Sequence, residues 1–126
     1  MAKVTEAPPT PTPEAPASET GTDPLGRLFA AIEVSRHADP SKSYTAKLFA
    51  RGRAKIAQKL GEEAVEAVIE AVRGDRPALI AESADLLYHL MVTWSDAGIK
   101  PAEVWAELAR REGISGIAEK SGRKAG

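Results

Sequence analysis

The 126-residue chain has no cysteine, which excludes disulfide bonds, thiol nucleophiles and zinc sites with cysteine ligands. It also has no apolar run close to the roughly 20 residues that a membrane-spanning helix needs. Its first residues lack the apolar segment of a secretory signal. These absences predict a soluble, intracellular protein, and we expect a cytoplasmic location.

Aromatic residues are scarce, with two each of Trp, Tyr and Phe, although 43% of the residues are hydrophobic. The core must therefore be built mainly from Ala, Leu, Ile and Val. A chain with about 100 residues available for folding forms one domain, and a domain of that size buries a modest fraction of its surface. We therefore expect the fold to be completed by dimerisation.

Charge of either sign is not in excess, because 17 basic and 18 acidic residues give a formal net charge of -1. No overall electric field then attracts nucleic acid or an anionic membrane, and neither is expected as a partner. Any electrostatic function must come from local clusters of charge.

The first part of the chain has a composition of its own. Residues 7–24 read APPTPTPEAPASETGTDP, and such a segment has too few apolar side chains to offset the entropy of ordering. We predict a disordered tail over residues 1–23 and one domain over residues 24–126, with the last few residues disordered. A proline-rich ligand for a partner domain is the alternative interpretation of the tail.

Apolar residues at helical spacing, separated by turn residues, predict an all-α fold. Asp23 followed by Pro24 is a helix start signal, whereas Gly74 and Gly98 are stop signals. No alternating strand pattern or internal repeat is present. The predicted helices cover residues 24–36, 44–51, 53–73, 76–97 and 101–111.

The helices over residues 53–73 and 76–97 are the longest, and only a short turn joins them. Such a connection favours antiparallel packing of the two helices as a hairpin. We therefore predict a small bundle of four to five helices.

Acidic residues cluster on both of these long helices. At about 100° per residue, Glu62, Glu63, Glu66 and Glu70 lie within one arc of roughly 100°, and the next helix carries Glu82 and Asp85. In an antiparallel hairpin the two acidic sets can face each other. Carboxylates that converge need a countercharge, and oxygen ligands suit a hard cation such as Mg²⁺ or Mn²⁺.

Two other interpretations of the acidic residues are open at this point. They can be the solvated faces of amphipathic helices, because charge runs on helices are usually solvated. A di-iron site also uses helical carboxylates, but it needs Glu-x-x-His pairs. Neither His37 nor His89 has an acidic residue three positions before it, so we discount the di-iron site.

Four segments of the chain resemble the stand-alone phosphoribosyl-ATP pyrophosphohydrolases of histidine biosynthesis. They are SYTAKL (43–48), KIAQKLGEEAVE (55–66), ESADLLYHLMV (82–92) and SGIAEKSGR (115–123). The broader group of MazG-like all-α nucleotide pyrophosphohydrolases is marked by ExxE and ExxD, which residues 63–66 and 82–85 match. The SYT and DLLYH sequences are the signals that point to the histidine-pathway member.

The resemblance implies hydrolysis of phosphoribosyl-ATP to phosphoribosyl-AMP and pyrophosphate. It implies Mg²⁺, with Mn²⁺ possible, held by the carboxylates of the two motifs, and Glu62 as the preferred acceptor of the proton from water. The metal ligands would be Glu63, Glu66, Glu82 and Asp85.

Substrate contacts are expected from Lys59, Lys55, Arg51, Tyr44 and His89. Each has a structural alternative, such as a solvated cation or a histidine with satisfied hydrogen bonds. Tyr88, Trp94 and Trp105 are assigned to packing, with the hydroxyl of Tyr88 paired.

Two other functions are also compatible with the sequence. One is a MazG-like house-cleaning hydrolase of non-canonical nucleoside triphosphates. The other is a helical dimerisation module without catalytic activity.

Overall fold

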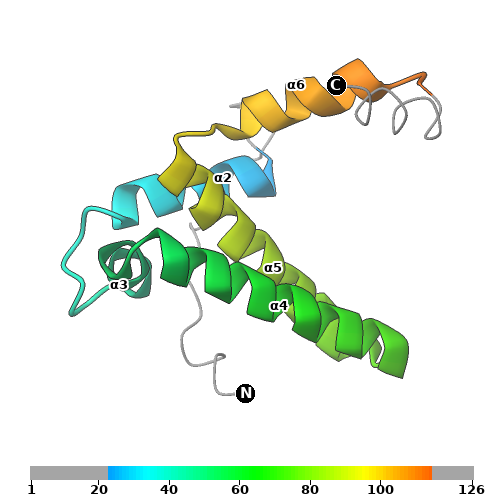
Figure 1. Cartoon of the computed structure of the whole chain (residues 1–126), viewed down its shortest axis with the longest axis horizontal. Coiled ribbons are helices and arrows are strands. Elements are labelled where there is room, and N and C mark those ends of the chain that lie inside the picture. Colours follow the sequence, from blue (N-terminus) through cyan, green and yellow to red (C-terminus); the bar gives the residue numbers. More distant parts are fainter. Residues whose placement is uncertain (1–22, 115–126) are drawn as a thin grey trace.

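The computed structural model describes residues 23–114, and within them the chain forms five helices and no strand. The prediction of an all-α fold is confirmed (Figure 1). The predicted disordered tail, except Asp23, and the family-like segment at 115–123 lie outside the described residues. None of the described helices is long and apolar enough to cross a bilayer.

The first two helices, α2 (Pro24–Ser35) and α3 (Tyr44–Arg51), begin after residues whose side chains cap them. The side chain of Asp23 accepts a hydrogen bond from the backbone N–H of Gly26 at 2.7 Å. The side chain of Ser43 accepts one from Ala46 at 3.1 Å. Such caps satisfy N–H groups that have no partner within the helix. Ser43 is therefore a helix cap in this fold.

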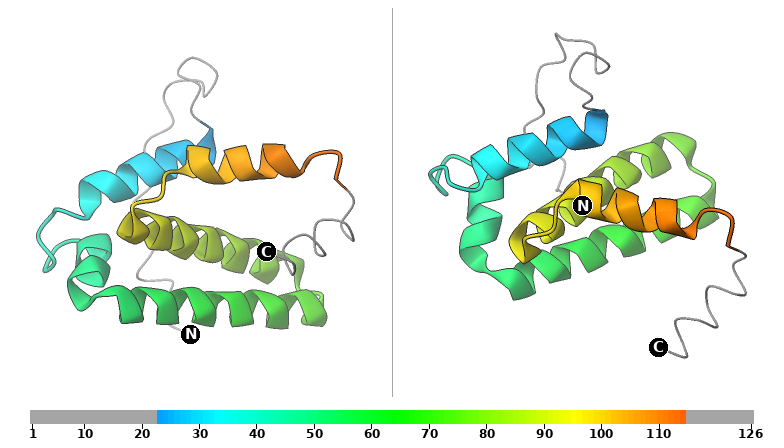
Figure 2. Two further views of the ribbon diagram at one scale, coloured as in Figure 1. Left: turned by 45° about the horizontal axis from the view of Figure 1, so that its top comes forward. Right: turned by 90° about the horizontal axis from the view of Figure 1, so that it is seen from above.

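The two long helices, α4 (Arg53–Arg73) and α5 (Arg76–Ala97), lie side by side and run in opposite directions (Figures 1 and 2). Each ends at a glycine in the left-handed conformation, Gly74 with φ of 74° and Gly98 with φ of 74°. Glycine adopts this conformation without steric cost. The last helix, α6, spans Pro101–Arg111, so the sequence-based boundaries agree with the structure to within one residue.

The buried core lies at the end of the hairpin where α4 begins and α5 ends. There α2 and α3 pack against the two long helices (Figure 2). Trp94 packs against this core and meets Trp105 of α6 edge to face, with ring centroids 6.0 Å apart. Both tryptophans therefore have the packing role that was predicted. The buried cluster consists of Phe29, Ile32, Leu48, Ile56, Tyr88, Met91 and Val92.

The rest of the hairpin has no comparable core. Among the described residues between Ile56 and Tyr88, Glu63 is the one side chain that is buried. Large aliphatic side chains are instead exposed on both helices. They are Val65, Val68, Ile69 and Val72 on α4 and Ile80 and Leu87 on α5.

A buried polar contact fixes α3 against α5. The hydroxyls of Thr45 and Tyr88, which are 0% and 2% exposed, share a hydrogen bond of 2.5 Å. Buried polar groups are costly unless they are paired. The contact therefore favours one position of α3 on the hairpin, and it confirms that the hydroxyl of Tyr88 is paired.

Replacement of Thr45 by valine should lower the free energy of unfolding by about 1–3 kcal/mol, because the hydroxyl of Tyr88 stays buried without a partner. The double variant with Tyr88→Phe should recover part of that loss, since no polar group is then left unsatisfied. Urea denaturation of the two single variants and the double variant measures the coupling. Simple additivity of the two single effects would contradict it.

Gly61 lies inside α4, where a glycine destabilises a helix by about 1 kcal/mol relative to alanine. It is not one of the described glycines with positive φ. A Cβ atom at this position would meet no atom within 4 Å. Neither backbone conformation nor packing within the described chain therefore requires glycine here.

Candidate metal and nucleotide site

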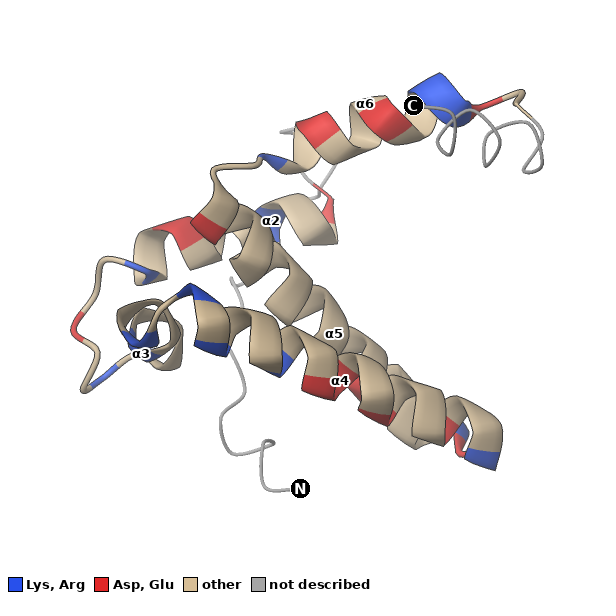
Figure 3. Ribbon diagram, in the orientation of Figure 1, with Lys and Arg blue, Asp and Glu red and all other residues tan. Residues whose placement is uncertain are grey.

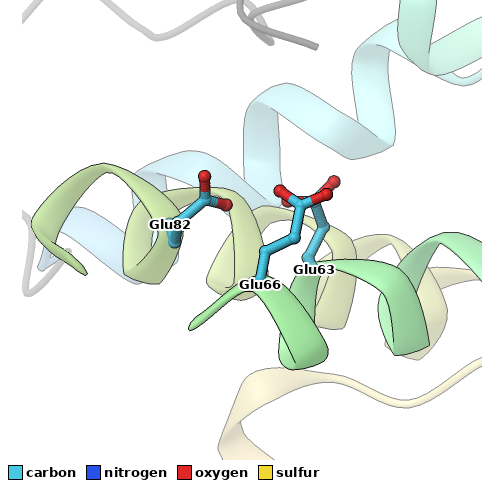
Figure 4. A group of neighbouring side chains, drawn as sticks. All are labelled: Glu63, Glu66 and Glu82. Carbon is cyan, nitrogen blue, oxygen red and sulfur yellow. The ribbon is translucent and has the colours of Figure 1, made fainter. Parts of the chain in front are cut away.

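Three carboxylates from the two long helices converge in the hairpin beyond the core. Glu63 and Glu66 extend from α4 and Glu82 from α5, and Figure 4 shows their side chains directed toward one another. One oxygen from each lies within 4.8 Å of the others. Glu63 is 0% exposed, and the other two are half-buried. We call Glu63, Glu66 and Glu82 the acidic triad.

The chemistry of the acidic triad fits a hard divalent cation. Two unit charges 4.8 Å apart repel by about 3 kcal/mol at an effective dielectric constant of about 20. A cation between the three groups would replace that repulsion with attraction. Carboxylate oxygens are the ligands that Mg²⁺ and Mn²⁺ prefer.

Asp85 is half-buried on α5, one turn after Glu82, but it is not among the side chains whose oxygens meet within 4.8 Å. Three of the four predicted ligands are thus brought together directly. The role of Asp85 as a ligand stays a prediction.

Glu62 lies beside the acidic triad but belongs to a different set of contacts. Gln58 Nε2 donates a hydrogen bond to its carboxylate at 2.7 Å, and Lys59 Nζ lies 3.3 Å from the other oxygen. These two contacts hold the pKa of Glu62 below its usual value, the hydrogen bond from Gln58 having the larger effect. Glu62 is therefore ionised at neutral pH.

Lys59 is the cation nearest to these acids. Partial burial by itself lowers the pKa of Lys59, but Tyr44 and the carboxylates of Glu62 and Glu63 outweigh that effect, so that the pKa is raised. Its ammonium group therefore stays charged over the whole physiological range. This position suits a contact to a phosphate oxygen.

His89 is buried next to two tyrosine rings. It is 5% exposed, its ring centroid lies 4.9 Å from that of Tyr88 and 6.3 Å from that of Tyr44, and both contacts are edge to face. Burial, followed by the nearby charge of Lys59, lowers its pKa to about 4, while Glu62 acts in the opposite direction. Its Nδ1 is buried without a hydrogen-bond partner among the described residues. The alternative of a histidine with satisfied hydrogen bonds does not describe this nitrogen.

The buried, neutral state of His89 predicts a pH effect on stability. The folded protein holds its pKa at about 4, whereas the unfolded chain has the ordinary value of about 6.5. Between these values the unfolded chain binds more protons, so the free energy of unfolding should decrease as the pH falls from 6.5 towards 4. Urea denaturation in the presence of a chelator, repeated at several pH values between 6.5 and 4, should show this decrease in the free energy of unfolding.

His89→Gln should weaken this dependence of the free energy of unfolding on pH. His37→Gln, at an exposed position, should leave it unchanged. Arg110 and Arg111 lower the pKa of Glu107 to about 2, so its contribution is lost only as the pH falls below the usual carboxyl range. An equal slope in the wild type and in His89→Gln would rule out His89 as the cause.

Basic residues gather on α3 and in the first half of α4, and acidic residues follow further along α4 (Figure 3). Arg51 is exposed at the end of α3, and Lys55 is half-buried in α4. Arg53, by contrast, donates to a carboxylate oxygen of Asp96 at 2.6 Å and to its carbonyl oxygen at 3.0 Å. It joins the start of α4 to the end of α5.

An open cavity of about 740 Å³ adjoins the acidic triad on α4. Neither this cavity nor the contact of Gln58 was predicted from the sequence, although the four-residue spacing of Gln58 and Glu62 was a signal for that contact. The lining residues are Gln58, Gly61, Glu62, Val65, Glu66 and Ile69.

Comparison with known proteins gives a consistent result. The family model for phosphoribosyl-ATP pyrophosphohydrolase matches residues 25–112. A phosphoribosyl-ATP pyrophosphatase of Azospirillum brasilense is 69% identical over 100 residues, which are 79% of this chain and 90% of that protein. The protein of the same name from Gluconobacter oxydans (strain 621H) is 63% identical over 99 residues, 79% of this chain and 74% of its own. That of Rhodospirillum rubrum is 54% identical over 112 residues, 89% of this chain and 96% of its own.

Proposed function

Because the chain belongs to the phosphoribosyl-ATP pyrophosphohydrolase family, we propose that it hydrolyses phosphoribosyl-ATP to phosphoribosyl-AMP and pyrophosphate, the second step of histidine biosynthesis. The observation that carries this proposal is the convergence of Glu63, Glu66 and Glu82 from two helices. Such a site suits the cleavage of a polyphosphate chain with the help of a divalent cation.

The metal ligands in this proposal are the acidic triad together with Asp85. When bound, Mg²⁺ or Mn²⁺ neutralises charge on the polyphosphate and lowers the pKa of a coordinated water. Glu63 contributes a fixed position, because its side chain is fully buried. Glu66 and Glu82 are half-buried and can face both the interior and a bound substrate.

The remaining residues act on water and substrate. Glu62 accepts a proton from the attacking water, since it is ionised and lies next to the acidic triad but outside it. The water oxygen bonds to one of the two phosphorus atoms of the α,β-anhydride, the bond between that phosphorus and the bridging oxygen breaks, and pyrophosphate leaves. Lys59, Lys55 and Arg51 contact phosphate oxygens, Tyr44 lies close to Lys59, and the neutral His89 offers a hydrogen bond without adding charge.

The working protein in this proposal is a homodimer. Six large aliphatic side chains on α4 and α5 are exposed, and the hairpin beyond Ile56 has no buried apolar side chain before Tyr88. Helical hairpins of this kind are stable when a second pair of helices covers their apolar surface. A second copy of the chain supplies such a pair. The cytoplasmic location stays a prediction.

The test is pyrophosphate release from phosphoribosyl-ATP and from a panel of deoxynucleoside triphosphates, each with and without Mg²⁺. We expect release from phosphoribosyl-ATP with Mg²⁺ and little release from the panel. Release from the panel alone would favour a MazG-like house-cleaning hydrolase. No release from any substrate would favour a dimerisation module without catalytic activity.

A further inference from the structure

The sequences SYT (43–45) and DLLYH (85–89) come into contact in the fold, one at the start of α3 and the other inside α5. Thr45 and Tyr88 share a buried hydrogen bond, and Tyr44 contacts the rings of Tyr88 and His89. Neither of the two bonded hydroxyls is among the groups that act on water or substrate in the proposed reaction. Their effect on the site can only be indirect.

The rings of Tyr44, Tyr88 and His89 form a triangle in which each ring contacts the other two. The ring centroid of Tyr88 lies 6.2 Å from that of Tyr44 and 4.9 Å from that of His89, and the centroids of Tyr44 and His89 are 6.3 Å apart. Buried side chains are closely packed, so one of these rings cannot move without displacing the others. The hydrogen bond from α5 to Thr45 therefore defines the place of the neighbouring residue, Tyr44.

The triangle of rings adjoins the charged groups of the candidate site at Lys59. Lys59 interacts electrostatically with both Tyr44 and His89, and its Nζ lies 3.3 Å from a carboxylate oxygen of Glu62. The side chain of Lys59 is only 17% exposed, so the groups around it determine its direction. A series of contacts thus leads from the hydroxyl pair to a cation and a carboxylate on α4.

We infer that the hydroxyl pair of Thr45 and Tyr88 positions Lys59 for the reaction, acting through the ring of Tyr44. This role rests on the proposed function, in which Lys59 contacts phosphate oxygens. It gives α3, a helix without an acidic residue, a part in the site that the acidic triad does not supply. Displacement by about 1 Å of a group that acts on the reacting atoms can lower a rate about 100-fold.

The double variant Thr45→Val with Tyr88→Phe removes the hydrogen bond and leaves no polar group unsatisfied, so it should be more stable than Thr45→Val alone. We still expect its kcat for phosphoribosyl-ATP to be at least about tenfold below that of the wild type, with KM changed by less than about threefold. Thr45→Ser keeps the hydroxyl and is the matched control, with kcat within about twofold of the wild type. Pyrophosphate release is measured with Mg²⁺ at a temperature where circular dichroism shows each variant to be folded.

A mutant cycle with Lys59 tests whether the hydroxyl pair acts through this cation. Lys59→Gln should itself lower kcat. The two hydroxyl substitutions should then lower kcat by less than about twofold further, because the group that they position is absent. An unchanged kcat in Lys59→Gln, or the same further loss in Lys59→Gln as in the wild type, would overturn the inference.

Wild-type kcat in the folded double variant, or an equal loss in Thr45→Ser, would show that the hydroxyl pair is a structural contact only. If the double variant does not fold, Tyr88→Phe takes its place with the same expected loss of kcat. Absence of hydrolysis by the wild type would refute the proposed function itself. Wild-type hydrolysis together with a fully active double variant would refute the positioning role alone.

Discussion

Glu63→Gln is expected to reduce kcat/KM by a factor on the order of 100 or more, because it removes a buried charge from the proposed metal site. The same change should raise the stability of the protein in a chelator. The charged form of a carboxylate that is 0% exposed and close to Glu66 and Glu82 is costly to bury. A neutral amide of nearly the same shape lowers that cost.

Two measurements separate these effects. Pyrophosphate release gives the loss of activity, and thermal unfolding with and without Mg²⁺ gives the stability. Added Mg²⁺ should raise the melting temperature of the wild type, since a ligand that binds only the folded state stabilises it, and it should have much less effect on Glu63→Gln. Glu70→Gln is the control. Glu70 is on the same helix but outside the acidic triad, and its Oε1 lies 3.7 Å from Nε of Arg73. Full activity of Glu63→Gln would refute the proposed site.

Val68→Asp is expected to weaken self-association by at least about 100-fold. Val68 is 61% exposed in the second half of α4, and in a symmetric dimer each substitution occurs twice at the interface. Burying two carboxylates without partners costs several kcal/mol. Sedimentation over a range of protein concentrations measures the change.

Val34→Asp is the matched control for this variant. Val34 is 77% exposed on α2 and is not part of the exposed apolar surface of α4 and α5, so its replacement should leave the association constant unchanged. A dimeric Val68→Asp protein, or equal dissociation of both variants, would show that α4 does not form the interface.

The helix ends and the meeting of Glu63, Glu66 and Glu82 could be predicted from the sequence. Asp23, Gly74 and Gly98 mark helix ends by interactions within a few residues, and such signals do not depend on the rest of the fold. The spacing of Glu63 and Glu66 likewise places them near each other on any helix. Their meeting with Glu82 was predictable because a short turn leaves few ways to pack two long helices.

Other features depend on packing between distant segments. Asp85 lies outside the acidic triad. Which side chains of α5 reach the carboxylates of α4 depends on how the two helices pack, and local sequence does not define that packing. Thr45 and Tyr88 are 43 residues apart, so their hydrogen bond depends on where α3 docks. Tyr88 could be predicted to need a partner, but Thr45 could not be identified as that partner.

The separation of the core from the acidic triad has a consequence for motion. The apolar cluster holds the start of α4 and the end of α5, whereas Glu63, Glu66 and Glu82 lie beyond it, where few apolar contacts support the helices. Local opening of a structure requires least free energy where such contacts are fewest. In a single copy of the chain, amide hydrogens around the three carboxylates would therefore exchange with solvent before those around Ile56 and Met91. In the proposed homodimer the partner copy would hold these carboxylates in place, and we therefore expect activity per chain to fall on dilution.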